Sequence, residues 1–450
     1  MSTDTPLAAP VVSRAVGATY VAFIGSGFAF ASWASRIPQV RDRLDLSTAA
    51  LGLVLLAIAA GSVLALPASG PVIARIGSRR MVAVMAVLLG SALVVASGGV
   101  LVGALPLLVL GLFLLGLANG AWDVAMNVHG AVVERLVGRT IMTRFHAGFS
   151  VGTVAGALLG TLLVHLDVPV PWHLAVVGVV VAVAVPLGSR AFVPDDSAAD
   201  LDPMDDGPVG GGLTRDDPAG DEPADGSPVG AAASLAAGPE PTASPAAAPA
   251  VAPRGAFASW TEPRTLLIGV FVLAFAFAEG TANDWIAVAV IDGYGADAAL
   301  GTLTFAVFLT AMTVGRWYGP DLLDRFGRVA TIRVMASVSL VGLLLFIFSP
   351  SLPLALVGAL LWGGGIALGF PLGMSAAADD PALAPGRVSV VASIGYVAFL
   401  AGPPLIGLLG EAAGVLRAVS VVAVLLALAL LVSGSVRPLE RAQTRRATTA

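Results

Sequence analysis

Two stretches of this sequence, LGLVLLAIAAGSVLALPASGP at 51–71 and LGTLTFAVFLTAMTVGRWYGP at 300–320, begin with Leu-Gly and end with Gly-Pro at one constant offset. The first is followed by VIARIGSRR and the second by DLLDRFGRV. A further match links RFHAGFSVG at 144–152 with RVSVVASIG at 387–395. The chain therefore contains an internal repeat, which predicts two similar halves.

The repeats lie in a chain of unusually apolar composition. Of its 450 residues, 57% are hydrophobic and 12% are charged. Windows of about 20 apolar residues, enough to cross a bilayer core of about 30 Å, recur along the chain. The sequence predicts an all-α polytopic membrane protein. The expected twelve transmembrane helices cover 15–36, 48–69, 80–98, 104–132, 145–165, 172–193, 265–290, 299–318, 329–349, 353–377, 389–409 and 415–434.

Six expected spans lie on each side of a long polar segment. Residues 195–253 hold twelve acids against one arginine and almost no large apolar side chain, so we expect a disordered linker there. Six is an even number, so both halves enter the membrane from the same side and form a parallel repeat. The expected division is an N-terminal tail at 1–13, a six-helix bundle at 14–193, an acidic Pro/Gly/Ala linker at 194–260, a second bundle at 261–435 and a C-terminal tail at 436–450.

Arginine indicates the orientation of these spans. Nineteen of the 24 arginines lie in the two tails or in the loops on the same side of the membrane as the tails. Because positive charge concentrates in cytoplasmic loops, we expect both termini in the cytoplasm and a multi-pass protein of the plasma membrane, the inner membrane of a bacterial cell.

Several function classes are excluded or disfavoured by residues that the chain lacks. It has no cysteine, hence no disulfide and no thiolate metal site, and it shows no clustered metal ligands, so we expect no cofactor and no metal. It also has no lysine, which excludes a Walker A phosphate loop. No nucleophile and base stand at a usable spacing, so we expect no enzyme and no nucleic-acid partner. Energy for any transport must come from a gradient.

The three asparagines of the chain mark a candidate site. Each lies inside an expected helix beside an acid. Asn119, Asp123 and Asn127 recur every fourth residue, which places them in one stripe on the fourth span. Glu279 and Asn283 make the same one-turn pair on the seventh span, followed by Asp284 and Trp285.

An acid at that depth costs about 2.5 to 3.5 kcal/mol on insertion scales, so membrane acids are functional by default. A carboxyl group in a low-dielectric cavity can take up a proton from one side and release it to the other, and carboxamides suit a polar solute. We therefore expect Asp123 and Glu279 to couple protons, Asn119, Asn127 and Asn283 to bind the solute, and Asp284 to lie at the cavity mouth. We expect Glu279 toward the outer end of its helix. The alternative is that these residues only bond neighbouring helices.

Other residues have more general interpretations. Trp33, Trp285, Trp362 and Tyr396 could stack on the apolar face of a solute ring. Arg316, inside the eighth span, is expected to pair with Asp321 and Asp324 near the cytoplasmic face, or else to bind a substrate anion. Arg36, His129 and His146 are expected at interfaces or in loops, with a proton relay as the alternative for histidine. The run WGGGIALGFP at 362–371 predicts a bendable tenth span.

The six-plus-six pattern and the loop after the second helix of each half resemble the major facilitator superfamily. The loop residues that carry the resemblance are Gly70, Arg75, Gly77, Arg79 and Arg80 in the first half, and Asp324, Arg325, Gly327 and Arg328 in the second. Ala74 stands where the family usually has aspartate. ASWASRIPQVRDRLDLS at 31–47, the run 123–152 and AEGTANDW at 278–285 most resemble the MosC-like branch, which is related to fucose/proton symporters.

The resemblance implies a fold, a site and a function. Spans one, four, seven and ten would line a central cavity, and a cytoplasmic gate would include Arg75, Arg79, Arg80, Glu134, Asp324, Arg325, Arg328 and Asp379. Within that gate, Arg75 is expected to latch to Glu134, and Arg325 to Asp379. The expected function is a monomeric, proton-coupled symporter in the lipid bilayer that moves a small polar solute, a sugar, cyclitol or derivative, by alternating access. An exporter of amphipathic compounds and a sensor that moves no solute are the alternatives.

Overall fold

The computed structural model describes residues 8–138, 141–197, 258–380 and 383–439. Within them lie twelve helical spans long and apolar enough to cross a membrane, as the sequence predicts. The first half contains α1 (Ala9–Ala34), α2 (Ile37–Arg43), α3 (Thr48–Ile76), α4 (Ser78–Val102), α5 (Leu105–Val137), α6 (Met142–His165) and α7 (Val170–Ser189). The second contains η2 (Ala258–Thr261), α8 (Pro263–Tyr294), α9 (Ala298–Phe326), α10 (Arg328–Phe348), α11 (Leu352–Ile366), α12 (Gly369–Ala377), α13 (Ala384–Ala413), α14 (Val415–Ala418), α15 (Ser420–Val432) and η3 (Ser433–Val436).

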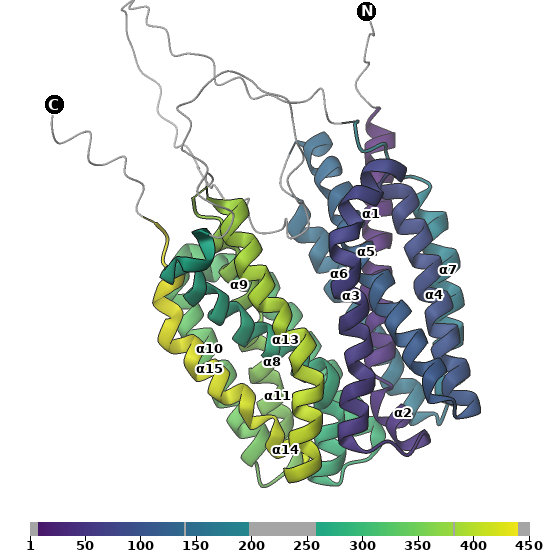
Figure 1. Ribbon diagram of the computed structural model, residues 1–450, viewed down its shortest axis with the longest axis vertical. Coiled ribbons are helices and arrows are strands. Elements are labelled where there is room, and N and C mark those ends of the chain that lie inside the picture. The colour runs from purple at the N-terminus through teal and green to yellow at the C-terminus, as the bar shows by residue number, and fades with distance from the viewer. Residues whose placement is uncertain (1–7, 139–140, 198–257, 381–382, 440–450) are drawn as a thin grey trace, which may run out of the picture.

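The two halves form two helical bundles side by side (Figure 1). In the first bundle, α4 packs on α5 and α7, α1 packs on α6, and α3 packs on α5. In the second, α10 packs on α11 and α15, while α8 packs on α13 and α9. The bundles meet where α3 contacts α13 and where α6 contacts α9. Most of the predicted linker falls on 198–257, outside the described residues.

The repeat in the sequence is a repeat in backbone conformation. The α3 helix ends at Gly77 with φ 81° and ψ 155°, and α9 ends at Gly327 with φ 76° and ψ 163°. In both cases the next helix begins at the following residue. Residues with a Cβ rarely adopt this φ, so glycine is required at the helix junction of both motifs. The motif therefore positions α4 on α3 and α10 on α9 in the same way.

Close helix crossings in the first bundle also depend on glycine. A Cβ placed on Gly27 of α1 would overlap the carbonyl oxygen of Phe149, and one on Gly152 of α6 would overlap that of Ile24. Glycines recur at 148, 152, 156 and 160 of α6, and they bring α6 against α1 backbone to backbone, as small residues do in membrane helix pairs.

The ends of several spans differ from the sequence prediction. The first span begins at Ala9 rather than near residue 15, and the fourth runs to Val137 rather than 132. The tenth span is interrupted between α11 and α12 at Ala367–Leu368, within the glycine-rich run that predicts a bend. The first span is also interrupted, at Ser35–Arg36, before Pro38.

The two ends of the molecule differ in how the halves meet. We call the end with the start of α1 and the end of η3 the terminal face, and the opposite end the α2 face. Figure 1 shows the bundles closest together at the α2 face and diverging toward the terminal face. At the α2 face, Arg41 Nη2 donates to Asp292 Oδ1 at 2.9 Å, and the backbone N–H of Ala49 donates to Glu411 Oε2 at 3.2 Å. These contacts join the first half to the second.

Candidate functional site

The polar stripe predicted on the fourth span is the accessible face of α5 between Asn119 and Asn127. Asn119, Asp123 and Asn127 are partly exposed, whereas every residue between them is buried. Asn127 Nδ2 donates to the backbone oxygen of Asp123 at 2.8 Å and to its Oδ1 at 3.3 Å. Ser26 Oγ of α1 donates to Asn119 Oδ1 at 3.1 Å. Asp123 therefore has a carboxamide partner, and it forms no ion pair within the part of the chain described.

A matching stripe lies on α8. From Ala274 to Val290 the partly exposed residues are Glu279, Gly280, Asn283 and Asp284, and the others are buried. Asn283 Oδ1 is buried without a hydrogen-bond partner among the described residues. A helix packed on nearly all sides thus leaves one polar strip open, near its midpoint.

Arg316 of α9 completes this strip. Its Nη2 donates to both carboxylate oxygens of Glu279 at 3.0 Å, and its Nε donates to the backbone oxygen of Ala367 at 3.4 Å. The predicted pairing of Arg316 with Asp321 and Asp324 is therefore wrong. Glu279 also lies near the middle of α8 rather than toward its outer end. It is about equally far along the helix from Pro263, the first residue, and from Tyr294, the last.

Ala367 links this ion pair to the interrupted tenth span. It stands between α11 and α12, where the helical ladder of hydrogen bonds is broken and a carbonyl oxygen is free to accept. Arg316 thus contacts Glu279 on α8 and the break in the tenth span at once. A movement at that break would change the contact between Arg316 and Ala367, and so the position of the Arg316–Glu279 pair.

Residues of each stripe or next to it interact electrostatically with the other half of the protein. Asp123 of α5 lies within electrostatic range of Tyr396 of α13, and Arg316 of α9 lies within electrostatic range of His146 of α6. Both relations cross from one bundle to the other. Asp123 therefore lies within electrostatic range of the second half of the protein.

Comparisons with known proteins bear directly on this arrangement. Residues 18–389 match the sequence profile of the Major Facilitator Superfamily. The chain belongs to this superfamily of transporters. It is 30% identical to an uncharacterized transporter, y4wD, of Sinorhizobium fredii, over 87% of this chain and 90% of that one. It is 26% identical to the membrane protein MosC of Rhizobium meliloti, over 88% and 84% of the two chains.

Solved structures of superfamily transporters share the fold. The nucleoside transporter NupG, in a point-variant form, superposes with a TM-score of 0.67 at 12% identity, over 95% of this chain and 98% of that one. A variant of the Escherichia coli fucose:proton symporter FucP gives a TM-score of 0.55 at 13% identity, over 94% and 98%. These likenesses show the fold alone. The family match shows that the chain is a membrane transporter rather than an enzyme.

Three of the four aromatic residues predicted to contact the solute are buried. Trp33, Trp285 and Trp362 are at most 1% exposed and pack inside the bundles of this superfamily fold. Their ring faces are closed to a solute in this conformation. Tyr396 is partly exposed and stays a candidate contact.

The predicted gate residues divide into exposed and bonded groups at the terminal face. Arg75, Arg79, Arg80, Asp324 and Arg325 are exposed. Neither predicted latch is formed in the described residues. Glu134 Oε2 instead accepts from the backbone N–H groups of Ile141 and Met142, at 2.7 and 2.6 Å.

Asp379, the gate acid of the second half, pairs with two arginines other than the predicted one. Asp379 pairs with Arg328 at 2.9 Å and with Arg264 at 2.8 Å, rather than with the predicted Arg325. These arginines come from the starts of α10 and α8. The cluster therefore fastens three elements within one half of the transporter and does not bridge the halves.

His129, expected at an interface or in a loop, is instead buried inside α5. His129 Nε2 accepts from the backbone N–H of Val193 at 3.2 Å, which leaves Nδ1 to donate to Thr19 Oγ1 at 3.0 Å. Both ring nitrogens are thus satisfied, so His129 is a structural residue of the first bundle rather than a relay. Arg36 is 1% exposed, at the break between α1 and α2.

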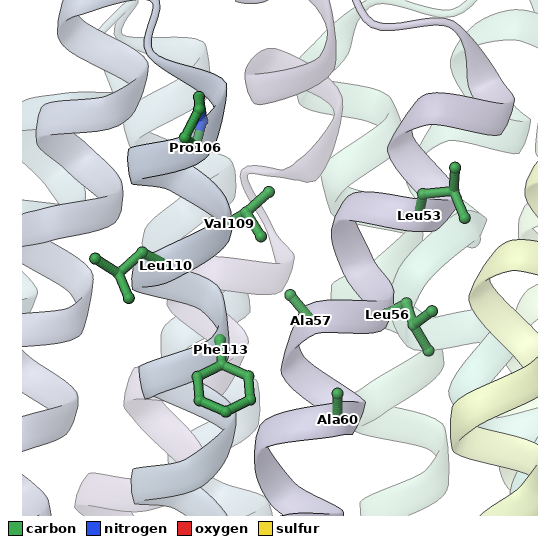
Figure 2. Close-up of a pocket in the computed structure, with 8 residues that line it drawn as sticks. All are labelled: Leu53, Leu56, Ala57, Ala60, Pro106, Val109, Leu110 and Phe113. Carbon is green, nitrogen blue, oxygen red and sulfur yellow. The ribbon is translucent and has the colours of Figure 1, made fainter.

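A separate groove on the first half has no polar lining. Figure 2 shows it between α3 and α5, with side chains that include Leu53, Leu110 and Phe113. Its volume is about 570 Å³, and none of its lining side chains can donate or accept a hydrogen bond. Leu53 and Leu110 are 59% and 49% exposed, as lipid-facing side chains of a membrane helix would be. It is therefore no site for a polar solute.

Proposed function

We propose that this superfamily member is a proton-coupled secondary transporter that moves a small hydroxylated solute by alternating access. The observation that carries the proposal is Asp123, a partly exposed acid inside a membrane span that lies within electrostatic range of the other half and has no cationic partner among the described residues. An ionised group in that position is costly to enclose, and protonation removes the cost. We assign Asp123 as the principal proton-coupling residue.

Glu279, the second acid predicted to couple protons, has a cationic partner. Glu279 accepts from Arg316 at 3.0 Å, so this acid has a cationic partner within the site. We propose that Glu279 and Arg316 position solute and transmit its presence to the break at Ala367. Asp284, on the accessible strip of α8 and without an ion pair in the described residues, is a further proton acceptor.

The groups around these acids suit hydroxyl groups. Asn119, Asn127 and Asn283 each offer both a donor and an acceptor, and Tyr396 offers a hydroxyl and an apolar ring face. Two proteins that share the fold are named for a sugar and for nucleosides, both rich in hydroxyl groups. We therefore propose a sugar, cyclitol or related compound as the solute class. The polar lining disfavours an amphipathic cargo.

We further propose that the terminal face is cytoplasmic and that the structure is open toward the cytoplasm. The exposed arginines Arg75, Arg79, Arg80 and Arg325 all lie at that face, as expected for the positive side of a plasma-membrane protein. The two halves are joined by polar contacts at the opposite, α2 face.

The test is solute uptake by the purified chain in proteoliposomes under an imposed pH gradient, with fucose, inositol and uridine as labelled probes. The wild-type chain is expected to accumulate one of them and to alkalinise the proton-rich side. Asp123→Asn is expected to abolish accumulation and to retain exchange of labelled for unlabelled solute. Asp321→Asn, an exposed acid near the end of α9, is the matched control and should leave both unchanged. Accumulation by Asp123→Asn at the wild-type level would refute the assignment, and a chain that binds a probe without flux would be a sensor.

A further inference from the structure

A second polar site lies at the α2 face, far along the first span from the acids described above. The chain breaks at Ser35–Arg36, and Arg36 is turned into the protein with 1% of its surface exposed. A cavity of about 610 Å³ adjoins this break. Its wall includes Arg36 and Gln39 from the first half and Asp297, Ala298 and Ala299 from the second. The cavity is therefore assembled from both halves.

The buried polar atoms at this cavity lack partners. Arg36 Nη2 and both side-chain heteroatoms of Gln39 are buried with no hydrogen bond in the described chain. Arg36 Nε donates to His173 Nδ1 at 2.9 Å, so the histidine accepts there and is neutral. His173 thus orients the guanidinium without supplying a counter-charge. A buried cation and unpaired amide atoms each cost free energy unless a ligand or water satisfies them.

The acids that share the cavity wall do not neutralise Arg36. Asp297 Oδ1 is engaged by the backbone N–H of Leu300 at 2.8 Å, as the cap of α9. Asp167 is exposed in the turn between α6 and α7, and Arg36 forms no ion pair with either acid in the residues described. Arg43 adds a second cation to the wall. The cavity wall therefore includes an unpaired guanidinium nitrogen and an unpaired amide, together with acids that form no ion pair with Arg36 in the described chain.

We propose that this cavity binds an oxyanion, a phosphate or carboxylate group, between Arg36 and Gln39, and that the bound anion stabilises the conformation in which the α2 face is closed. The unpaired Arg36 Nη2 and the unpaired Gln39 Nε2 could each donate to one oxygen of such a group. Because the second half supplies Asp297–Ala299 to the wall, separation of the halves at this face would dismantle the cavity. A ligand that binds one state only shifts the equilibrium toward that state.

The anion has two possible sources with the same chemistry. Exposed apolar side chains at the rim, Leu101 at 55% and Trp172 at 66%, suit the acyl region of a phospholipid whose headgroup phosphate enters the cavity. A dissolved anion from the aqueous side would use the same inner groups. The two probes are therefore phosphatidylglycerol in mixed micelles and inorganic phosphate.

The test is thermal unfolding of the full, detergent-purified chain, followed by tryptophan fluorescence, in a titration with each probe at constant ionic strength set with chloride. The wild-type chain is expected to show a saturable rise in midpoint with at least one probe. Gln39→Leu is expected to raise the half-saturating concentration of the probe at least threefold, and Arg36→Gln is expected to raise it at least tenfold. Arg417→Gln, an exposed arginine on the same face outside the cavity, should leave it unchanged.

Each outcome decides the proposal. Saturation by phosphate supports a dissolved anion, and saturation by the lipid alone supports a headgroup. No saturable rise with either probe overturns the site, as does wild-type affinity in Gln39→Leu and Arg36→Gln. Should Arg36→Gln fail to fold, the wild-type titration and Gln39→Leu still decide.

The conformational half of the proposal has its own readout. The chain has no native cysteine, so spin labels can be attached at Ala74→Cys of α3 and Asp321→Cys of α9, which are exposed near the terminal face on opposite halves. At a saturating probe concentration, we expect a larger fraction of molecules with the longer distance between the two labels. The longer distance corresponds to an open terminal face. An unchanged distance distribution at saturation would refute the stabilisation of this conformation.

Discussion

Removing the positive charge of Arg316 should destabilise the protein, and removing Glu279 as well should restore much of the loss. At an N–O distance of 3.0 Å and an effective dielectric constant of about 20, the Coulomb attraction of the pair is about 5.5 kcal/mol. The side chains are 29% and 23% exposed, so water screens part of this attraction and desolvation offsets more. We expect a net loss of about 1 to 3 kcal/mol for Arg316→Gln, because Glu279 is then left without its cation.

The double variant Arg316→Gln/Glu279→Gln leaves no unpaired charge at this position. Its loss should therefore be smaller than the sum of the single losses, with a coupling energy of about 1 to 2 kcal/mol. The measurement is the unfolding midpoint of the four proteins in one detergent, with Arg333→Gln as a control arginine that bonds Ser433 and no acid in the described chain. Additive losses, or an Arg316→Gln variant as stable as the wild type, would refute the role assigned to the pair.

Three further variants test other contacts. Asp379→Asn should lower the stability by about 2 to 4 kcal/mol, since Arg264 and Arg328 lose a shared partner, whereas the exposed Asp324→Asn should have little effect in the same unfolding assay. Gly152→Val should abolish recovery of monodisperse protein, because its side chain would overlap the α1 backbone, whereas Gly17→Ala, with open space around it, should purify normally on size-exclusion chromatography. Arg41→Gln should raise the population with an open α2 face about fivefold, measured by spin-label distances across that face, because it removes one ion pair of roughly 1 kcal/mol.

The sequence predicts the fold well because its strongest signals are local or repeated. Hydrophobic length alone identifies all twelve spans, and the repeat predicts equivalent helix junctions at Gly77 and Gly327. The stripe of Asn119, Asp123 and Asn127 also follows from helical spacing, since it depends on one helix only. The break in the tenth span follows from consecutive glycines.

The partners of charged residues could not be predicted in the same way. The sequence suggested Asp321 and Asp324 for Arg316 because they lie one or two turns away on the same helix, but the side chain turns to Glu279 on α8. Depth offers a signal that was missed: Arg316 and Glu279 lie at similar distances from the α2-face ends of two antiparallel helices. The burial of Trp33, Trp285 and Trp362 depends on helix rotation, which no residue spacing specifies.

Charge balance at the central site gives a physical reason for coupling. With every acid ionised, Asp123, Glu279 and Asp284 oppose the single charge of Arg316, which leaves two uncompensated negative charges. Alternating access requires the site to close to both sides, and enclosing a net charge in a low-dielectric interior costs several kcal/mol. A neutral hydroxylated solute adds no charge, so protons on Asp123 and Asp284 would be the route to a neutral enclosed site. An anionic solute would increase the imbalance. Under the proposed function, the unpaired acids would require protonation before closure, and this requirement would favour a neutral solute carried together with protons.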